Sequence, residues 1–314
     1  MCSTGKWNWS FDDDGIHDYG THATGYTRGG LVGRSNGAVH TDLALCRLAP
    51  GGRINRHVHY FEQCAYVLGG RPVVESNGQR LQLQTGDYVH FPVASPHGWL
   101  NPGEMEARWL ELSTPQPLPP GRQRDDTYFL PGSSDPQAVL PARLPDPTIA
   151  NVGTYLGTPP QHEALATTGP ARGRAPAGID TALLAYSGIS VKMLVDPNMG
   201  AELLTMFMVD YEPGGAAQIH DHPFEEAYFF LEGEIEAEVE GQKMTLGAGD
   251  FLFCGVGVLH GFFNTTPGRV RWIETQAPQP PRRHSYRWPA HWAELGSKVS
   301  VRTGQDAGSG QAKS

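Results

Sequence analysis

Several features that define other classes of protein are scarce in this chain of 314 residues. It has four cysteines, none of them in a C-x-x-C pair, and their spacing gives no disulfide framework. No apolar run approaches the roughly 20 residues that a membrane-spanning helix needs. Residues 1–20 are acidic and lack the apolar stretch of a secretory signal. We therefore expect a cytoplasmic protein with reduced thiols.

Positive charge is also in short supply. Lysine and arginine together number 24 against 33 aspartates and glutamates, which gives a formal net charge of −9 at pH 7. Phosphate backbones and anionic membrane surfaces repel an acidic protein. The composition therefore predicts neither a nucleic-acid partner nor a membrane partner.

Glycine and proline are abundant, with 39 and 26 residues respectively. They separate short apolar runs such as Leu203–Tyr211, a pattern that predicts many turns between short strands and hence an all-β fold. A chain of this length favours about two domains, each large enough to bury its own core.

The stretch from Pro213 to Asn264 carries the clearest chemical signature. It contains three histidines and one glutamate at defined spacing, namely His220, His222, Glu226 and His260. Three imidazoles and one carboxylate form a ligand set for a divalent transition metal. On one continuous strand the first three would share a face, because side chains alternate with period two. His260 would then reach them from a second strand across a small barrel.

The same pattern occurs earlier in the chain, without a gap. Its members are His57, His59, Gln63 and His97, and each precedes its counterpart by 163 positions. The offset continues into residues 108–111 and 271–274, which read Arg-Trp-Leu-Glu and Arg-Trp-Ile-Glu. Two long copies predict two similar domains rather than a solenoid of short units.

The domain boundaries follow from composition around these two copies. We expect an N-terminal arm over 1–40, a first barrel over 41–113, a proline-rich connector over 114–178, a second barrel over 179–276, a C-terminal docking segment over 277–303 and a disordered tail over 304–314. The arm contains three further histidines, His17, His22 and His40, which we expect to be solvated rather than ligands.

Both copies resemble the cupin superfamily, whose two motifs match Gly214–Gly233 and Gly249–Asn264 in the second half. In the first half they match Gly51–Gly70 and Gly86–Asn101. The resemblance implies two tandem cupin barrels of the jelly-roll (double-stranded β-helix) type, hence a bicupin. It also implies that the four second-half ligands bind a metal.

Gln63 stands where the family pattern has glutamate. An amide oxygen can ligate a metal but carries no charge, so the first-half set should bind a cation more weakly. Three interpretations stay open for the first barrel: an altered catalytic site, a structural metal site, or a barrel without metal.

The three-histidine, one-glutamate set resembles that of quercetin dioxygenase and related enzymes, which use iron, manganese, nickel or copper. This implies a metal-dependent dioxygenase acting on a small aromatic or enol-type molecule, with dioxygen as the second substrate. Glu226 would serve as ligand and catalytic base. Tyr228, Phe230, Phe262 and Met206 or Met208 would line an apolar pocket.

Other functions remain alternatives. Oxalate decarboxylase is a manganese bicupin, but no clear acidic lid is visible in this sequence. Ureidoglycine aminohydrolases use a Glu, His, His and Gln ligand set, which differs from the one here. Another decarboxylase, an isomerase or a zinc-dependent hydrolase, and a non-enzymatic small-molecule-binding bicupin, complete the alternatives. The family resemblance also implies a homodimer.

Overall fold

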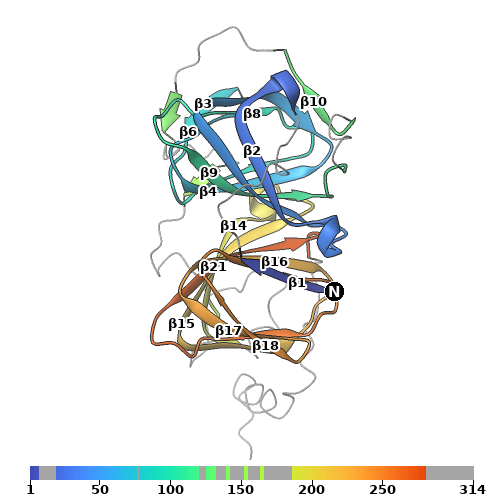
Figure 1. The fold of residues 1–314 in the computed structure, drawn as a ribbon, viewed down its shortest axis with the longest axis vertical. Coiled ribbons are helices and arrows are strands. Elements are labelled where there is room, and N and C mark those ends of the chain that lie inside the picture. The colour runs from blue at the N-terminus through green and yellow to red at the C-terminus, as the bar shows by residue number, and fades with distance from the viewer. Residues whose placement is uncertain are drawn as a thin grey trace, which may run out of the picture.

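The fold is that of a computed structural model, which describes residues 1–6, 19–76, 78–119, 125–131, 139–141, 152–154, 163–165 and 186–280. His17, most of the connector, most of the docking segment and the tail lie outside these residues. The described residues form two curled β-sheets stacked along the long axis of the molecule (Figure 1). The predicted all-β architecture of two tandem barrels is confirmed. No helix in this part of the chain is long and apolar enough to cross a membrane.

The first barrel is an eleven-stranded sheet with the order β11-β6-β5-β8-β3-β9-β4-β7-β12, in which β2 and β10 also pair with β3. Its strands are β2 (Ala23–Val32), β3 (Asp42–His59), β4 (Glu62–Gly69), β5 (Val73–Ser76), β6 (Gln79–Gln82), β7 (Asp87–Phe91), β8 (His97–Leu100), β9 (Ala107–Thr114), β10 (Thr127–Phe129), β11 (Val139–Pro141) and β12 (Val152–Thr154).

The second barrel is a ten-stranded sheet with the order β1-β19-β16-β21-β15-β20-β17-β18, extended by β14 on β15 and β13 on β14. Its strands are β1 (Cys2–Lys6), β13 (Glu163–Leu165), β14 (Tyr186–Val195), β15 (Thr205–His220), β16 (Glu225–Glu232), β17 (Glu234–Val239), β18 (Gln242–Gly247), β19 (Asp250–Cys254), β20 (His260–Phe263) and β21 (Val270–Ala277). Short 3-10 turns occur at Gly20–His22, Arg34–Asn36 and Pro197–Met199.

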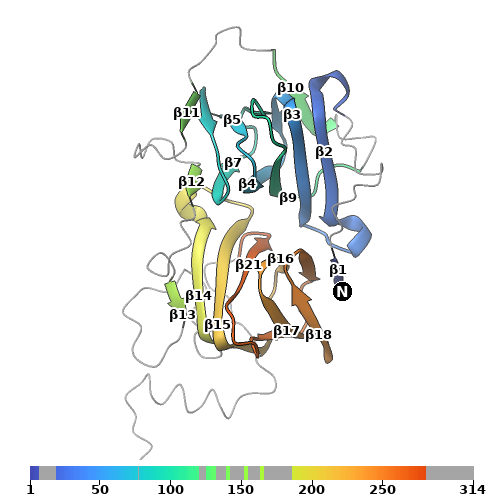
Figure 2. The same ribbon diagram turned by 60° about the vertical axis from the view of Figure 1, so that its left-hand side comes forward.

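The repeated unit begins earlier than the motifs alone indicate. β2 and β14 start 163 positions apart, as do β3 and β15. Residues 23–32, which the sequence places in an N-terminal arm, are therefore a strand of the first sheet. β1 instead pairs antiparallel with β19, so the start of the chain completes the second sheet (Figure 2).

The motif glycines explain why the two copies turn alike. Gly70 and Gly233 both have left-handed backbone angles, with φ of 76° and 78°. A Cβ at either position would come within 2.6 Å of the backbone oxygen of Glu106 or Arg269, the residue before the facing strand. Only glycine fits such a turn without strain.

The strand after Gly233 shows how the acidic segment is used. In β17 the residues Ile235, Ala237 and Val239 are buried, whereas the glutamates between them face outward. Alternation of this kind places one face on the core and the other in water. The acidic run is thus a solvated sheet face.

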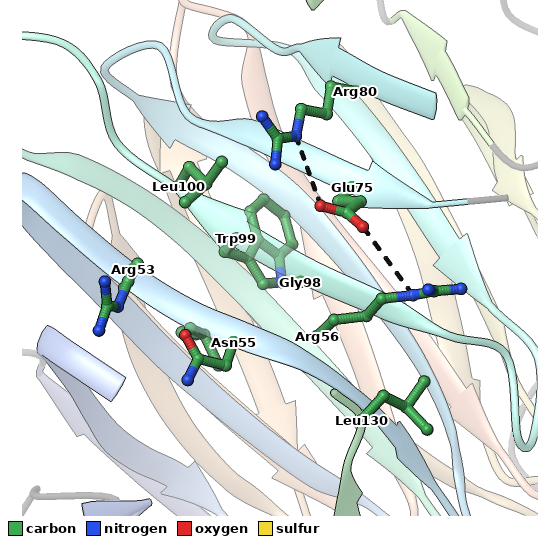
Figure 3. A pocket seen from close by; sticks show the side chains of 10 residues that line it. Arg53, Asn55, Arg56, Glu75, Arg80, Gly98, Trp99, Leu100 and Leu130 are labelled. Atoms are coloured by element: carbon green, nitrogen blue, oxygen red, sulfur yellow. Dashed lines mark hydrogen bonds and ion pairs between the residues drawn. The ribbon is translucent and has the colours of Figure 1, made fainter. Parts of the chain in front are cut away.

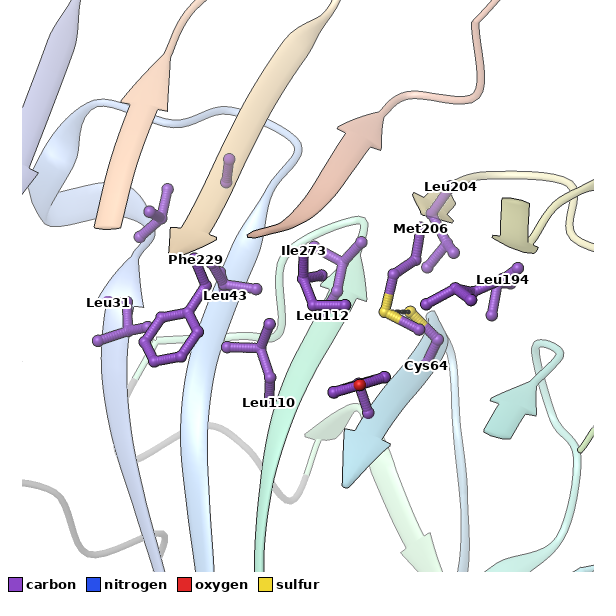
Figure 4. Packing of buried hydrophobic residues seen from close by; sticks show 14 of the residues in the cluster. Leu31, Leu43, Cys64, Leu110, Leu112, Leu194, Leu204, Met206, Phe229 and Ile273 are labelled. Carbon is purple, nitrogen blue, oxygen red and sulfur yellow. Dashed lines mark hydrogen bonds between the residues drawn. The ribbon is translucent and has the colours of Figure 1, made fainter. Parts of the chain in front are cut away.

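Besides the core inside each barrel, a third hydrophobic cluster lies between the two barrels and contains residues of both. It contains Leu43, Cys64 and Leu112 of the first barrel with Met206 and Ile273 of the second (Figure 4). Met208 belongs to the same cluster. The prediction that these methionines line a pocket in the second barrel is wrong, because they point to the opposite face of β15 from the interior residues Phe207 and Val209.

Two buried glutamates, one in each barrel, form equivalent hydrogen bonds to backbone N–H groups of the other barrel. Glu225 accepts hydrogen bonds from the backbone N–H groups of residues 39–41 at 2.7 to 3.0 Å. Glu62 accepts from those of residues 202–203 at 2.6 to 3.2 Å. Each carboxylate sits next to the ligand position of its barrel, 63 or 226, so the interface also positions the sites. His40 lies in this contact.

Candidate metal centres

The second-half histidines reach the barrel interior from two strands and a bend. β15 ends at His220, and β16 begins only at Glu225. The prediction of one continuous strand is therefore wrong; Pro223, which has no N–H to donate, lies in the intervening bend. His220 instead faces His260 of β20 in register, and His222 reaches inward from the bend.

The ring nitrogens of this triad converge. Ligand atoms of His220, His222 and His260 all lie within 4.8 Å of one another, and all three rings are buried. Each Nδ1 lies 2.7 to 2.9 Å from a backbone carbonyl oxygen. A carbonyl only accepts, so Nδ1 carries the proton and the Nε2 lone pair faces inward. Burial and then the neighbouring imidazoles hold the pKa of His220 well below its ordinary value, which keeps it neutral and able to ligate.

Glu226 completes the cluster. Its Oε2 lies 2.7 Å from Nε2 of His222 and 3.4 Å from Nε2 of His260. With Nδ1 protonated, these contacts bring acceptors face to face, and a bound cation or an additional proton is needed between them. Burial opposes ionisation of Glu226, but positive charge on the His222 and His260 imidazoles, which such an additional proton provides, outweighs it and holds the pKa of Glu226 well below its ordinary value. The donor set therefore fits a divalent metal.

Two further side chains hold the carboxylate in place. The Tyr228 hydroxyl donates to Oε2 of Glu226 and lies 3.1 Å from Nε2 of His260. The amide of Gln276, on the neighbouring strand β21, donates to Oε1 at 2.7 Å. Sequence reasoning missed Gln276. Its only signal is that Gln276 and Glu226 are opposed in strand register, which becomes visible once the pairing is known.

A second acid, Glu274, lies in the same interior and was also missed. The Trp272 indole donates to it at 3.0 Å. Burial and then the Glu226 carboxylate raise the pKa of Glu274 well above its ordinary value. The corresponding Glu111 of the first barrel has a cation instead, since Arg28 donates to it at 2.9 Å. The second barrel thus places a second buried carboxyl group beside Glu226, where the first barrel has an ion pair.

The first-half histidines form an equivalent triad. Ligand atoms of His57, His59 and His97 lie within 4.8 Å of one another. Nδ1 of His57 and of His97 each lie next to a carbonyl, at 2.7 and 2.9 Å. Nε2 of His97 is buried and has no hydrogen-bond partner in the described part of the chain. An orphaned lone pair at this point fits a metal ion.

The first triad also has a way to exist without metal. Nε2 of His57 and His59 are 3.1 Å apart, and Nδ1 of His59 lies 3.0 Å from the Thr127 hydroxyl. A proton on Nε2 of His59 would satisfy both contacts once the Thr127 hydroxyl directs its proton to Nδ1 of His59 instead of Oδ1 of Asp126, which lies 3.1 Å away. Gln63 directs its amide to Ser113 at 3.3 Å. Burial lowers the pKa of His57 to about 4, so this ring is neutral.

The chain also matches known proteins. A family model described as "Cupin domain" matches residues 44–113 and 207–275. The chain is 31% identical over 106 residues to polyketide synthase CurC of Streptomyces cyaneus, covering 33% of this chain and 68% of that protein. It is 30% identical over 118 residues to tetracenomycin polyketide synthase protein TcmJ of Streptomyces glaucescens, covering 37% and 77%. The chain belongs to the cupin family.

A further relative is the HTH-type transcriptional regulator PuuR of Escherichia coli, which is 34% identical over 92 residues. The alignment covers 29% of this chain and about half (49%) of that protein. Among solved structures, salicylate 1,2-dioxygenase of Pseudaminobacter salicylatoxidans aligns with a TM-score of 0.60 at 16% identity, over 80% of this chain and 76% of that one. Oxalate decarboxylase of Bacillus subtilis aligns with 0.55 at 17%, over 90% and 80%. These likenesses extend over both barrels. The protein is a bicupin with a histidine triad in each barrel.

Proposed function

We propose that this bicupin is a metal-dependent enzyme whose chemistry takes place in the second barrel, and that it is a dioxygenase acting on a small enol-type or aromatic molecule. The observation that supports the second barrel is the contact of Glu226 Oε2 with the Nε2 atoms of His222 and His260. A carboxylate among imidazole nitrogens supplies the negative charge that a divalent cation requires.

His220, His222, Glu226 and His260 would hold the metal. A bound iron, manganese, nickel or copper ion would supply Lewis acidity toward a substrate hydroxyl and, with dioxygen, redox chemistry. Glu226 is also placed to take the substrate proton at Oε2, the oxygen that already accepts from Tyr228. Tyr228 and Gln276 keep the carboxylate oriented, and burial of the cluster excludes water.

The substrate class rests on the character of the interior and on the relatives. Tyr228, Phe230, Phe262 and Trp272 surround one another with ring centroids 5.1 to 6.3 Å apart. These rings are packed in the barrel core beside the histidines, and aromatic side chains favour a flat, apolar molecule. The names of CurC and TcmJ connect those relatives with polyketide synthases, and polyketide chains carry readily deprotonated enols and phenols. Both points favour such a substrate over oxalate.

Oxygen uptake tests the proposal. Purified protein with its metal would be screened against 1,3-diketones, flavonols and hydroxybenzoates, with products identified by mass spectrometry. We expect stoichiometric uptake of dioxygen with one class and none with His220→Ala. Turnover that proceeds equally under argon would assign the protein to the non-oxidative alternatives, such as a decarboxylase, isomerase or aminohydrolase.

A small-molecule-binding role is the second candidate, favoured by the match to a transcriptional regulator. In that case the second barrel would bind a ligand through its metal without consuming it. Tight binding of one member of the panel, with neither dioxygen uptake nor product, would favour this role over catalysis.

A further inference from the structure

A cavity of about 350 Å³ lies on the first barrel and is separate from the metal ligands (Figure 3). Its charged rim consists of Arg53, Arg56, Arg80 and a single acid, Glu75; Arg56 and Arg80 lie next to Glu75, and Arg53 lies apart from them, near Asn55 (Figure 3). Small-molecule sites generally begin at about 300 Å³. The cavity is therefore large enough for one small ligand.

The charge of the rim is not balanced within the cavity. Three guanidiniums against one carboxylate leave a formal charge of +2 in a chain whose net charge is −9. The Arg80 and Arg56 Nε atoms lie 3.4 and 3.9 Å from Glu75. Each guanidinium has five N–H donors and a carboxylate has about four acceptor positions, so donors remain in excess. This rim matches an added anion.

The lining also has an apolar part. Leu100 and Leu130 contribute apolar side chains to the cavity (Figure 3), whereas the Trp99 indole is buried in the barrel interior against Trp109. Gly98 passes beneath the rim where a Cβ would come within 3.2 Å of Arg56. A ligand for this lining carries an apolar group beside its negative charge.

The duplication provides an internal comparison. β3 pairs with β8 through Arg53 and Leu100, and β15 pairs with β20 in the same register through Ala216 and Phe263. The backbone is thus the same, but only the first barrel carries the arginines. The positions of Arg56 and Arg80 are occupied in the second barrel by isoleucine and lysine, at 219 and 243. Of the three cations, the second barrel keeps only the one at the position of Arg80, so the cluster of three is specific to the first copy of the repeat.

The cavity is also connected to the first triad through one residue of its lining. Asn55, which lines it, accepts the Nδ1 proton of His57 at 2.7 Å through its backbone carbonyl. From these observations we infer that the cavity is a binding site for a small organic anion, an aryl carboxylate or aryl phosphate, distinct from both histidine triads.

Isothermal titration with benzoate and with phenyl phosphate tests this inference, with benzyl alcohol as the uncharged control. The wild-type protein should bind one or both anions and not the alcohol. The double variant Arg56→Gln, Arg80→Gln should bind about tenfold more weakly or worse, because two charge-assisted contacts are lost. Lys243→Gln, at the matched position of the second barrel, should bind like wild type. Thermal melting would verify that all variants fold.

Two triad variants separate this site from anion binding at a metal. His57→Ala and His220→Ala should each retain the affinity of the wild-type protein for the anion. Loss of binding in either triad variant, equal affinity of the arginine variant and Lys243→Gln, or no binding to the wild-type protein would overturn the inference. These outcomes are independent of whether the second barrel is a dioxygenase.

Discussion

The two barrels share a backbone and differ in what it encloses. Strand register is the same around both triads, where His57 faces His97 and His220 faces His260. The interior positions that surround the triads have changed. Gln63, Ala65 and Ser113 of the first barrel correspond to Glu226, Tyr228 and Gln276 of the second. The carboxylate, its phenol donor and its amide donor therefore occur together in one copy only.

This difference shows how a duplicated scaffold can separate functions. In the first barrel the buried Glu111 is paired with Arg28. The ring nitrogens of its triad can form most of their hydrogen bonds to each other and to Thr127 without a metal ion. The second barrel has valine at the position of Arg28 and keeps the Glu226 carboxylate against its histidines, with no arginine or lysine forming an ion pair with it in the described part of the chain. Cation binding is favoured where negative charge is left uncompensated by protein.

Removal of a second-barrel histidine should have the largest effect. His220→Ala or His260→Ala should abolish activity and metal binding in the second barrel, because one of four ligands is lost from a buried site. His57→Ala should reduce activity by less. Metal analysis by mass spectrometry together with oxygen uptake measures both. Complete loss of turnover in His57→Ala alone would place the chemistry in the first barrel.

Exchange of the glutamate and glutamine should come next. Even outer partners of a metal site are worth about 10–100-fold in affinity, so Glu226→Gln should weaken metal binding in the second barrel by about 100-fold or more. Gln63→Glu should strengthen binding in the first barrel by about tenfold, since it restores one negative charge. Competition with a chelator measures both constants. An unchanged affinity in either variant would show that the substituted residue is not a ligand.

Loss of the phenol should have a smaller effect. Tyr228→Phe removes a hydrogen bond to a charged oxygen, worth about 1.5–3 kcal/mol, so kcat should fall about tenfold while metal content stays the same. Tyr211→Phe is the matched control, because Tyr211 is buried in the same barrel and packs on Trp272. Equal losses in the two variants would mean that Tyr228 serves packing alone.

The smallest expected effect is the pH dependence of the stability of the metal-free protein. The pKa of His57 falls from 6.5 to about 4 on burial, so between these values the unfolded chain binds a proton that the folded protein does not. Stability therefore decreases as pH falls below 6.5. His57 alone should account for about 1 kcal/mol between pH 7.5 and 5.5. Urea unfolding of wild type and His57→Gln at both values measures it; an equal pH dependence in the two proteins would contradict the assignment.

The sequence predicts the two barrels and brings together the right histidines because both rest on spacing. A constant offset between His57 and His220 requires no knowledge of the fold. Features that depend on strand pairing are invisible at that level. Gln276 reaches Glu226 only through the register of β16 with β21, and Glu225 binds backbone groups of the other barrel.

The apolar run around Met206 shows a second limit of prediction from sequence. Leu203–Tyr211 is apolar on both faces, since one face fills the barrel and the other packs between barrels. Without alternation, no residue in it can be assigned to a face from sequence. The start of the repeat at Ala23 was missed for a related reason, because β2 carries no motif residue.

Metal content is the most direct test of the unequal barrels. Protein expressed with iron, manganese, nickel, copper and zinc would be dialysed against graded chelator and its metal counted by mass spectrometry, for wild type, His220→Ala and His57→Ala. We predict one tightly held transition-metal ion per chain that is lost in His220→Ala and retained in His57→Ala. A tightly held ion that survives in His220→Ala and disappears in His57→Ala would contradict the assignment of the main site to the second barrel.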